Sequence, residues 1–357
     1  MTLRERHLRQ KTCQHVDRLP WKANAPWAET LKRWRQEGLG EGNWEEILGV
    51  EPEFNCAPVN LGLSPWFEEK IIEDKGETQI CQDSWGIIFE ARKDGCSMPR
   101  WIEHPVKCRS DWERLRDERL NPDDPARFPE DWAEVAATMN ADQDRVTMLG
   151  GFLYGVFGTP RSLLGTEEVL VTFFDDPDLM HEMMDYLTDF WIAIYEKVVR
   201  KLKVDVVHIW EDMAGKNGSL ISPELIREFM LPNYIKVKQF VDKHDIPIFS
   251  GDSDGNLREL VPIFHEVGVN RYIPFEVVAG NDILEYRRRF PDLCINGGID
   301  KRVLAIGREA WQSELNKVRE MLKYPGYEPS LDHAVPPDVS WQNFYDFHME
   351  LKEVIYG

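Results

Sequence analysis

The sequence has no long apolar run and no ordered set of cysteines. Its opening residues carry no hydrophobic segment of the kind that forms a signal peptide, and no stretch approaches the roughly 18 apolar residues that cross a membrane. The six cysteines are scattered, without a C-x-x-C pair, which indicates reduced thiols and neither a disulfide framework nor a zinc ribbon. A cytoplasmic protein without a membrane partner is therefore expected. The six are Cys13, Cys56, Cys81, Cys96, Cys108 and Cys294.

Motifs for nucleotide and acyl chemistry are absent too. The chain has no G-x-x-x-x-G-K-[ST] phosphate loop and no G-x-S-x-G elbow, and Gly297-Gly298 is too short for a dinucleotide loop. Positive charge is scarce, with 43 Lys and Arg against 63 Asp and Glu, a net charge of −20. Long-range repulsion therefore argues against nucleic acid and anionic membranes as partners, and an anionic substrate would need a local cluster of cations.

The 357 residues contain enough apolar material for a large core, since 42% are hydrophobic and 11% aromatic. Residues 1–140 are rich in Trp, Pro and charge, with extended segments at 56–61 and 85–89. Three prolines predict a loop at 121–129. From about residue 141, short apolar runs alternate with helical periodicity, the pattern of repeated βα units. We expect one domain over residues 1–357, with residues 1–140 forming an N-terminal elaboration and the first strands.

Six strands and five helices are predicted in the regular part of the chain. Asp and Ser residues followed by Pro mark two of the helix starts, near residues 176 and 222. With room for two more strands in the first half, the pattern predicts an α/β fold, an eight-stranded (β/α)8 TIM barrel with an N-terminal elaboration. The strands are expected at 145–149, 204–210, 246–250, 269–275, 293–297 and 328–332. The helices are expected at 179–202, from 222 onward, and at 256–267, 282–290 and 308–324.

Acidic residues follow five of the six predicted strands. The carboxyl ends of the strands form the active site of a βα barrel, so these residues predict an acidic cup around His333. Helix capping would explain any single one of them equally well. His208 lies inside an apolar strand and is expected to be a hydrogen-bonded core histidine. The polar strand ends are Glu211-Asp212, Asp252-Ser253-Asp254, Glu276, Asp300 and Asp332-His333.

The densest of these strand ends is Gly251-Asp252-Ser253-Asp254-Gly255. Two carboxylates at i and i+2 can share a metal ion, or one can raise the pKa of the other so that it holds a proton near neutrality. A turn in which both aspartates bond their own backbone is the alternative.

Four segments resemble the uroporphyrinogen decarboxylase superfamily, which includes corrinoid-dependent methyltransferases. Their order and spacing cover nearly the whole chain, and the resemblance implies a (β/α)8 barrel. The segments are Arg4-Glu5-Arg6 with Val16-Asp17-Arg18-Leu19-Pro20, Gly165 through Phe174-Asp175-Asp176-Pro177, Ile221-Ser222-Pro223-Glu224-Leu225 with Leu231-Pro232-Asn233-Tyr234, and Gly297-Gly298-Ile299-Asp300 with Leu331-Asp332-His333-Ala334-Val335-Pro336-Pro337 and Asn343.

Departures from the family pattern favour one branch. The decarboxylases carry an arginine-rich segment for substrate carboxylates, whereas residues 21–27 here contain no arginine. His333 does fall where the decarboxylases keep a histidine. The thiol-directed methyltransferases bind zinc through His-x-Cys and a later Cys, and those positions hold Asp252, Asp254 and His333 here. The resemblance therefore implies that these three residues would hold a harder divalent metal instead of zinc. The branch that lacks these cysteines includes enzymes that move a methyl group from methylcobalamin to tetrahydrofolate.

The resemblance therefore implies a methyltransferase that moves a methyl group between methylcobalamin or a corrinoid protein and a small acceptor, with tetrahydrofolate favoured. A dimer is possible. A decarboxylase or lyase on another substrate and a non-catalytic binding member are the alternatives. In the implied site, Asp252 and Asp254 orient the acceptor or exchange its proton, and His333 is a proton relay or metal ligand. The other implied site residues are Glu211, Asp212, Trp210 and Glu276 around the cup, Asn296 and Asp300 at its floor, and Gly150, Gly151 and Gly155 against the cofactor.

Overall fold

The computed structural model describes residues 1–95 and 98–357. Within these ranges, no helix combines the length and the apolar character needed to cross a membrane. The five cysteines that lie there are free thiols, as predicted, and Cys96 lies outside the described residues.

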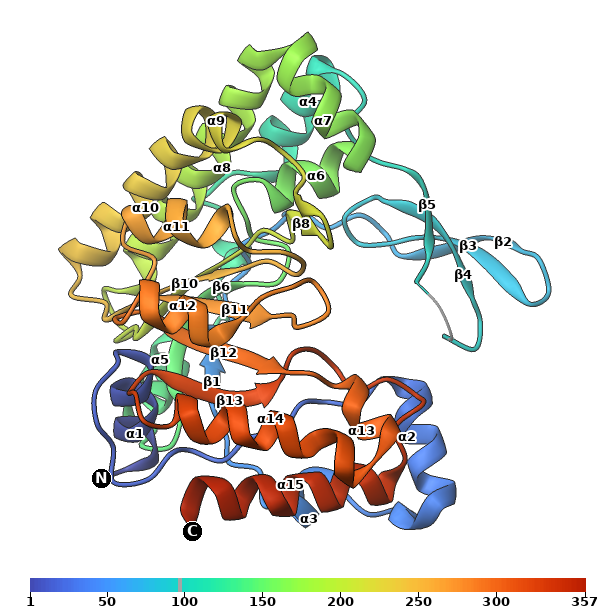
Figure 1. Ribbon diagram of the computed structural model, residues 1–357. Coiled ribbons are helices and arrows are strands. Elements are labelled where there is room, and N and C mark those ends of the chain that lie inside the picture. Colours follow the sequence, from blue (N-terminus) through green and yellow to red (C-terminus); the bar gives the residue numbers. More distant parts are fainter. Residues whose placement is uncertain (96–97) are drawn as a thin grey trace.

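A curled sheet of seven parallel strands forms the centre of the molecule, in the order β1-β6-β7-β10-β11-β12-β13 (Figure 1). The six strands predicted for the second half are all present, and each begins within two residues of its predicted start. Their apolar runs are buried on both sides because helices cover the outer face of the sheet. The strands are β1 (Phe54–Cys56), β6 (Val146–Gly151), β7 (Val206–Trp210), β10 (Ile248–Asp252), β11 (Arg271–Phe275), β12 (Cys294–Ile299) and β13 (Tyr327–Leu331).

The helices on the outer face begin where the sequence signals a cap. The carboxylate of Asp176 accepts from the backbone N–H of Leu179, and Pro177 occupies the first turn of α8 (Pro177–Val198). Ser222 caps the short α9 (Pro223–Leu225) in the same way, and a π-helical turn then leads into α10 (Leu231–Lys243). The remaining outer helices are α6 (Gly158–Leu164), α7 (Thr166–Asp175), α11 (Leu260–Glu266), α12 (Ile283–Arg289), α13 (Arg302–Ile306), α14 (Arg308–Met321) and α15 (Trp341–Tyr356).

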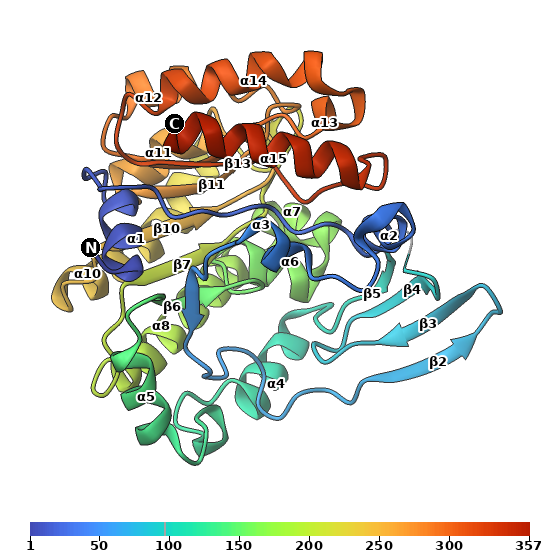
Figure 2. The same ribbon diagram turned by 90° about the horizontal axis from the view of Figure 1, so that it is seen from below.

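The first half of the chain contributes one strand to this sheet and builds a separate one. A four-stranded antiparallel sheet projects from the body of the molecule (Figures 1 and 2), and none of its strand residues is buried. The predicted loop at 121–129 holds a short 3-10 turn. The elements are α1 (Leu3–Lys11), α2 (Ala28–Trp34), α3 (Trp44–Leu48), β2 (Lys70–Asp74), β3 (Thr78–Gln82), β4 (Ile88–Arg92), β5 (Arg100–Glu103), α4 (Arg109–Arg119) and α5 (Trp132–Ala141).

The barrel is open, which differs from the closed eight-stranded prediction. In the described residues, strand pairing links seven strands, and β13 is not paired with β1. Residues 21–27 run beside the end of β13 but make only one isolated bridge, Pro26 to Val335. Proline has no N–H to continue a ladder, and Asn24 instead bonds the backbone N–H and C=O of Leu331 with its side chain. This segment therefore occupies the eighth position without forming a strand.

A buried ion cluster joins the two open margins of the sheet. The ammonium of Lys11 lies 2.7 Å from Glu328 Oε1 on β13 and 2.8 Å from Glu53 Oε1 just before β1, and its side chain is fully buried. Arg271 and Lys22 also contact Glu328, at 2.7 and 3.2 Å. Burial alone would raise the pKa of Glu328, but Arg271 and Lys11 hold that pKa well below its usual range. The cluster is therefore charged, with three cations facing two carboxylates.

Replacing Lys11 by Met tests this cluster. We expect Lys11→Met to lower the free energy of unfolding by about 3–5 kcal/mol, because it removes a partner from the buried carboxylate of Glu328 and the part-buried carboxylate of Glu53. Chemical denaturation at neutral pH measures the change. Lys32→Met on the exposed surface of α2 is the matched control and should have little effect. A loss below about 1 kcal/mol for Lys11→Met would show that the ammonium is not needed to hold the margins together.

Candidate functional site

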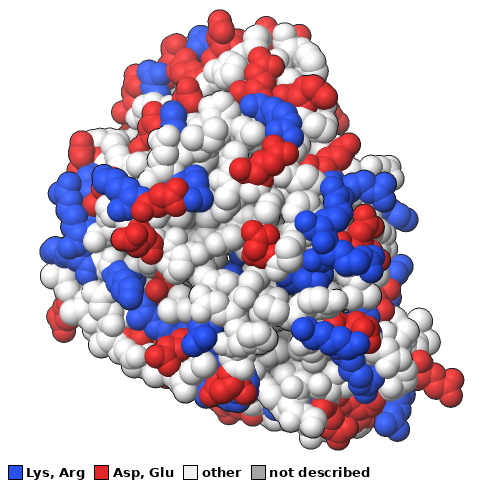
Figure 3. Space-filling view, turned by 60° about the vertical axis from the view of Figure 1, so that its left-hand side comes forward, with Lys and Arg blue, Asp and Glu red and all other residues white. Residues whose placement is uncertain are grey.

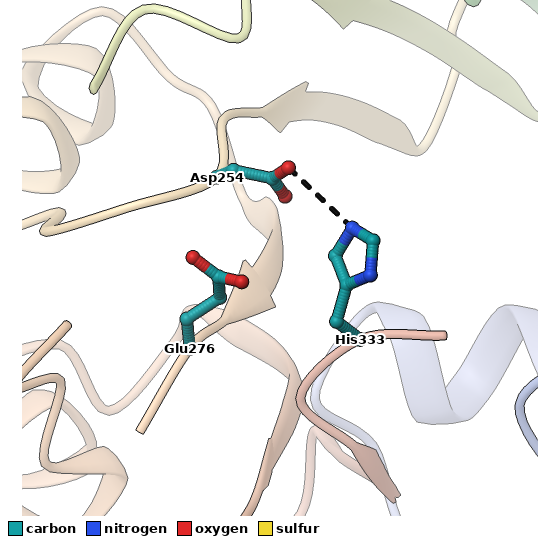
Figure 4. A group of neighbouring side chains, drawn as sticks. All are labelled: Asp254, Glu276 and His333. Atoms are coloured by element: carbon teal, nitrogen blue, oxygen red, sulfur yellow. Dashed lines mark ion pairs between the residues drawn. The ribbon is translucent and has the colours of Figure 1, made fainter. Parts of the chain in front are cut away.

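Three side chains converge at the carboxyl ends of the central strands (Figure 4). Asp254 follows β10, Glu276 follows β11 and His333 follows β13, and one ligand atom from each lies within 4.8 Å of the others. Up to about 80 residues separate them in the sequence, so only the parallel sheet brings them together. The predicted metal group contained Asp252 in place of Glu276. In the described part of the chain, the group with metal-binding geometry is the one that contains Glu276.

Asp254 and His333 form an ion pair at the mouth of the sheet. His333 Nε2 lies 3.4 Å from Asp254 Oδ2, and the side chains are 34% and 41% exposed. The hydrogen bond to Asp254 raises the pKa of His333, and burial opposes that rise. An imidazole beside an accessible carboxylate can exchange protons with a bound molecule.

Asp252 lies deeper than Asp254. It is the last residue of β10, and no described residue donates a hydrogen bond to its carboxyl group. Burial raises the pKa of Asp252 well above its usual range, and the charges of Asp254 and Asp212 raise it further, against the opposing effect of Arg271. This carboxyl therefore retains its proton more readily than a solvent-exposed aspartate, and the effect of Asp254 agrees with the pKa rise that the i, i+2 spacing predicts.

Glu211 lies beneath the mouth and caps a helix. Its side chain is fully buried, and its oxygens accept from the backbone N–H groups of Val156, Phe157 and Gly158 at 2.7–3.0 Å. The hydroxyl of Tyr234 donates a fourth bond, at 2.7 Å. Burial raises the pKa of Glu211 to about 7, and these four bonds oppose the rise. The contacts place Glu211 at the start of α6 rather than on the surface of the cup.

Two further strand-end acids, Asp300 and Asp332, also accept hydrogen bonds from backbone N–H groups. Asp300 accepts from the backbone N–H of Arg302 and pairs with its guanidinium at 2.7 Å. Asp332 is buried and accepts from the backbone N–H groups of Val277 and Lys301. Capping, the alternative weighed for single strand ends, thus accounts for part of the acidic recurrence. Figure 3 shows basic side chains beside acidic ones on the outer face it presents, so the charge excess does not form one acidic surface there.

Asn296, expected at the floor of the site, and two of the three expected site glycines pack against neighbouring strands. Asn296 on β12 accepts a hydrogen bond from Ser330 of β13, at 3.2 Å. A Cβ on Gly150 would lie 2.0 Å from the carbonyl oxygen of His208, and one on Gly155 would lie 1.8 Å from that of Trp210. Gly150 lets the end of β6 pack on β7, and Gly155 does the same for the loop after β6. Gly151 has φ +115° and no such close contact.

His208 and Arg271 occupy the interior below the mouth. Ser250 Oγ lies 2.9 Å from His208 Nδ1 and accepts from Arg271 at 3.1 Å. Burial, with the neighbouring guanidinium, lowers the pKa of His208 to about 3. It is therefore a neutral, hydrogen-bonded core histidine, as the apolar strand around it predicts.

Sequence reasoning missed Arg161. This residue of α6 donates to Asp212 at 2.6 Å, and its guanidinium lies 5.5 Å from the centre of the Trp210 ring. Asp212, named from its strand end, has φ +43°, a conformation that non-glycine residues rarely adopt. Nothing local in the sequence marks Arg161, because it faces the mouth from the helix and not from a strand end.

Glu211→Gln separates a capping role from a chemical one. The amide nitrogen of Gln would replace one carboxylate oxygen that accepts hydrogen bonds from backbone N–H groups, so two donors would face each other. We therefore expect the free energy of unfolding to fall by about 1–3 kcal/mol. Thermal and urea denaturation measure this loss. Glu353→Gln, on the exposed end of α15, is the control. Unchanged stability in Glu211→Gln would contradict the capping assignment.

Comparisons with known proteins agree on the family. Residues 84–354 match the model of the family described as Uroporphyrinogen decarboxylase (URO-D). A curated relative from Streptomyces coelicolor, "Uroporphyrinogen decarboxylase", is 27% identical over 249 residues, which are 66% of this chain and 64% of that protein. Relatives of the same name from Jannaschia and Hydrogenobaculum are 23% and 24% identical over about half of each chain. The chain thus matches less than two thirds of the length of these relatives.

A solved structure supports the fold over the full length. A "methyltransferase from Methanosarcina mazei" superposes on this chain with a TM-score of 0.57 at 14% identity, covering 100% of both chains. At this identity the likeness concerns the fold. The family model covers well over half of the chain, and the chain therefore belongs to the uroporphyrinogen decarboxylase family.

Proposed function

We propose that this protein is a methyltransferase that moves a methyl group between a corrinoid and a small acceptor, with tetrahydrofolate as the favoured acceptor. The observation that carries the proposal is the convergence of Asp254, Glu276 and His333 beside the deeper Asp252. These groups can bind a neutral or cationic nitrogen and manage its proton. Cytoplasmic location, a single functional domain over residues 1–357 and a possible dimer stay predictions.

The charges around the mouth favour this proposal over a polycarboxylate substrate. Arg161 is paired with Asp212 and Arg302 with Asp300, so both arginines already have a carboxylate partner. Residues 21–27, where the decarboxylases carry arginines, place Lys22 in the buried cluster instead. A substrate rich in carboxylates would meet repulsion from the acids of the cup.

Two exposed apolar side chains near strand ends suit a large partner with an apolar edge. Val278 follows β11, and Trp27 donates its backbone N–H to Val335 beyond the end of β13. These side chains are 37% and 40% exposed. A bound corrinoid would supply a methyl group carried on cobalt, and Val278 and Trp27 would offer it apolar contacts.

The residues of the cup would act on the acceptor. Asp254 would accept a hydrogen bond from the N–H of the acceptor nitrogen and orient its lone pair toward the methyl group. When the nitrogen gains the methyl group it must lose a proton, and His333 in its neutral form could take that proton while Asp254 stabilises the resulting imidazolium. Asp252, with its raised pKa, would hold a proton and donate to an acceptor oxygen or nitrogen.

The names of known relatives support both candidate reactions. The fold neighbour from Methanosarcina mazei is called a methyltransferase, whereas the curated relatives are called uroporphyrinogen decarboxylases. Decarboxylation is therefore the second candidate. It would use His333 and the same acids on another substrate, and it is assayed in parallel with uroporphyrinogen.

The central experiment mixes the pure protein with methylcobalamin and tetrahydrofolate and follows the cobalamin absorbance spectrum. We expect demethylation of the cobalamin with wild type and a rate at least about 100-fold lower with Asp254→Asn, because general acid-base groups typically contribute that much. Asp338→Asn, an exposed aspartate after His333, is the control and should keep full activity. Turnover of uroporphyrinogen without any cobalamin change would instead support the decarboxylase.

The same residues offer a metal site that can be tested without turnover. Two carboxylates and one imidazole suit a hard divalent cation such as Mn²⁺. Because His333 must lose its proton to bind a metal and its pKa is raised, we expect Mn²⁺ affinity to increase as pH rises through that pKa. Calorimetric titration with Mn²⁺ should show Glu276→Gln binding at least tenfold more weakly than the exposed control Glu285→Gln. Absence of Mn²⁺ binding to wild type at any pH would leave His333 as a proton relay alone.

A further inference from the structure

An exposed aromatic ring lies beside the cup on the loop after β6. The Phe152 side chain is 71% exposed, yet its ring lies 4.9 Å from that of Trp210 at an interplanar angle of 59°. The guanidinium of Arg161 lies 5.5 Å from the centre of the same indole. Trp210 therefore supports both groups, and a large part of the Phe152 ring is left open to solvent.

The backbone around this ring is strained. Leu153, the next residue, has φ +69°, and Asp212, which pairs with Arg161, has φ +43°. They are two of the four non-glycine residues with positive φ in the described part of the chain. Such conformations cost free energy and concentrate at ligand-binding positions.

The ring also lies on the correct side of the sheet to meet a substrate of the cup. Trp210 pairs in register with Asp252 of the adjacent strand, so both side chains leave the same face of the sheet. Gly151, directly before Phe152, pairs with Ile209 of β7. A molecule that rests on Phe152 can thus reach toward the Asp252 carboxyl group.

We infer that Phe152 is the stacking residue for the flat pyrimidine ring of an acceptor of the reduced pterin class. The inference rests on the proposed function, since it concerns the acceptor of the same site. Stacking needs an open π face held in place, which the contact with Trp210 provides. The partly exposed carboxylate of Asp212 adds an acceptor for N–H groups on the edge of such a ring, as a pterin carries.

Binding of 5-methyltetrahydrofolate, measured by calorimetry without any cobalamin, tests the inference independently of methyl transfer. We expect Phe152→Ala to weaken binding about tenfold and Phe152→Trp to retain it, because an aromatic face contributes about that much to stacking on a ring. Phe174→Ala is the matched control, since Phe174 on α7 is 73% exposed. Unchanged thermal stability of Phe152→Ala confirms that the variant is folded.

Three outcomes would overturn the inference. The first is no binding of 5-methyltetrahydrofolate to wild type at millimolar concentration, and the second is equal weakening by Phe152→Ala and Phe174→Ala. The third is a Phe152→Ala variant that binds hydroxocobalamin more weakly and 5-methyltetrahydrofolate as tightly as wild type does. That result would assign the Phe152 ring to the corrinoid. Folate binding that depends on Phe152 without any methyl transfer would support the stacking site and contradict the proposed reaction, so the two failures are distinguishable.

Discussion

A buried ammonium group, that of Lys11, joins the two open margins of the central sheet. Backbone pairing stops at β1 on one side and at β13 on the other, and Lys11 contacts a carboxylate at each margin. Charge thus links the two margins, which strand pairing does not join in the described residues. A buried charge is tolerated only when it is paired, so α1, the start of β1 and β13 must be in place together. Glu328 of this contact lies on β13, the strand that His333 follows.

The same cluster extends toward the candidate site. Arg271 contacts Glu328 in the cluster and Ser250 above it, and its charge opposes the rise in the pKa of Asp252. The buried ion cluster contains three cations and two carboxylates, whereas several acids lie at the mouth. The excess positive charge below therefore makes the concentration of carboxylates at the mouth less costly. Arg271 therefore acts both in the ion cluster that joins the sheet margins and on the acids of the site.

Much of the fold could be predicted because each βα unit has a local pattern. Apolar runs predicted the six strands, and Asp176 and Ser222 predicted two helix starts. The open barrel could not be predicted, since it depends on Asn24 bonding Leu331 across the chain. At the site, strand-end position predicted Asp254, Glu276 and His333 as neighbours, and their ligand atoms lie within 4.8 Å of one another. Strand-end position did not distinguish Glu211 from these residues. Glu211 also follows a strand, although its carboxylate caps α6 and does not face the mouth.

The sequence by itself determined the class of fold, the family and the strand ends at which polar groups collect, because periodicity, caps and motifs are local properties of the chain. The tertiary structure alone decided which of those groups meet. It placed Lys11 between two distant carboxylates, Arg161 against Asp212, and Phe152 on Trp210. These contacts join residues of separate elements, and their distances are set by how the strands curl and the helices pack. No pattern within one segment carries that information.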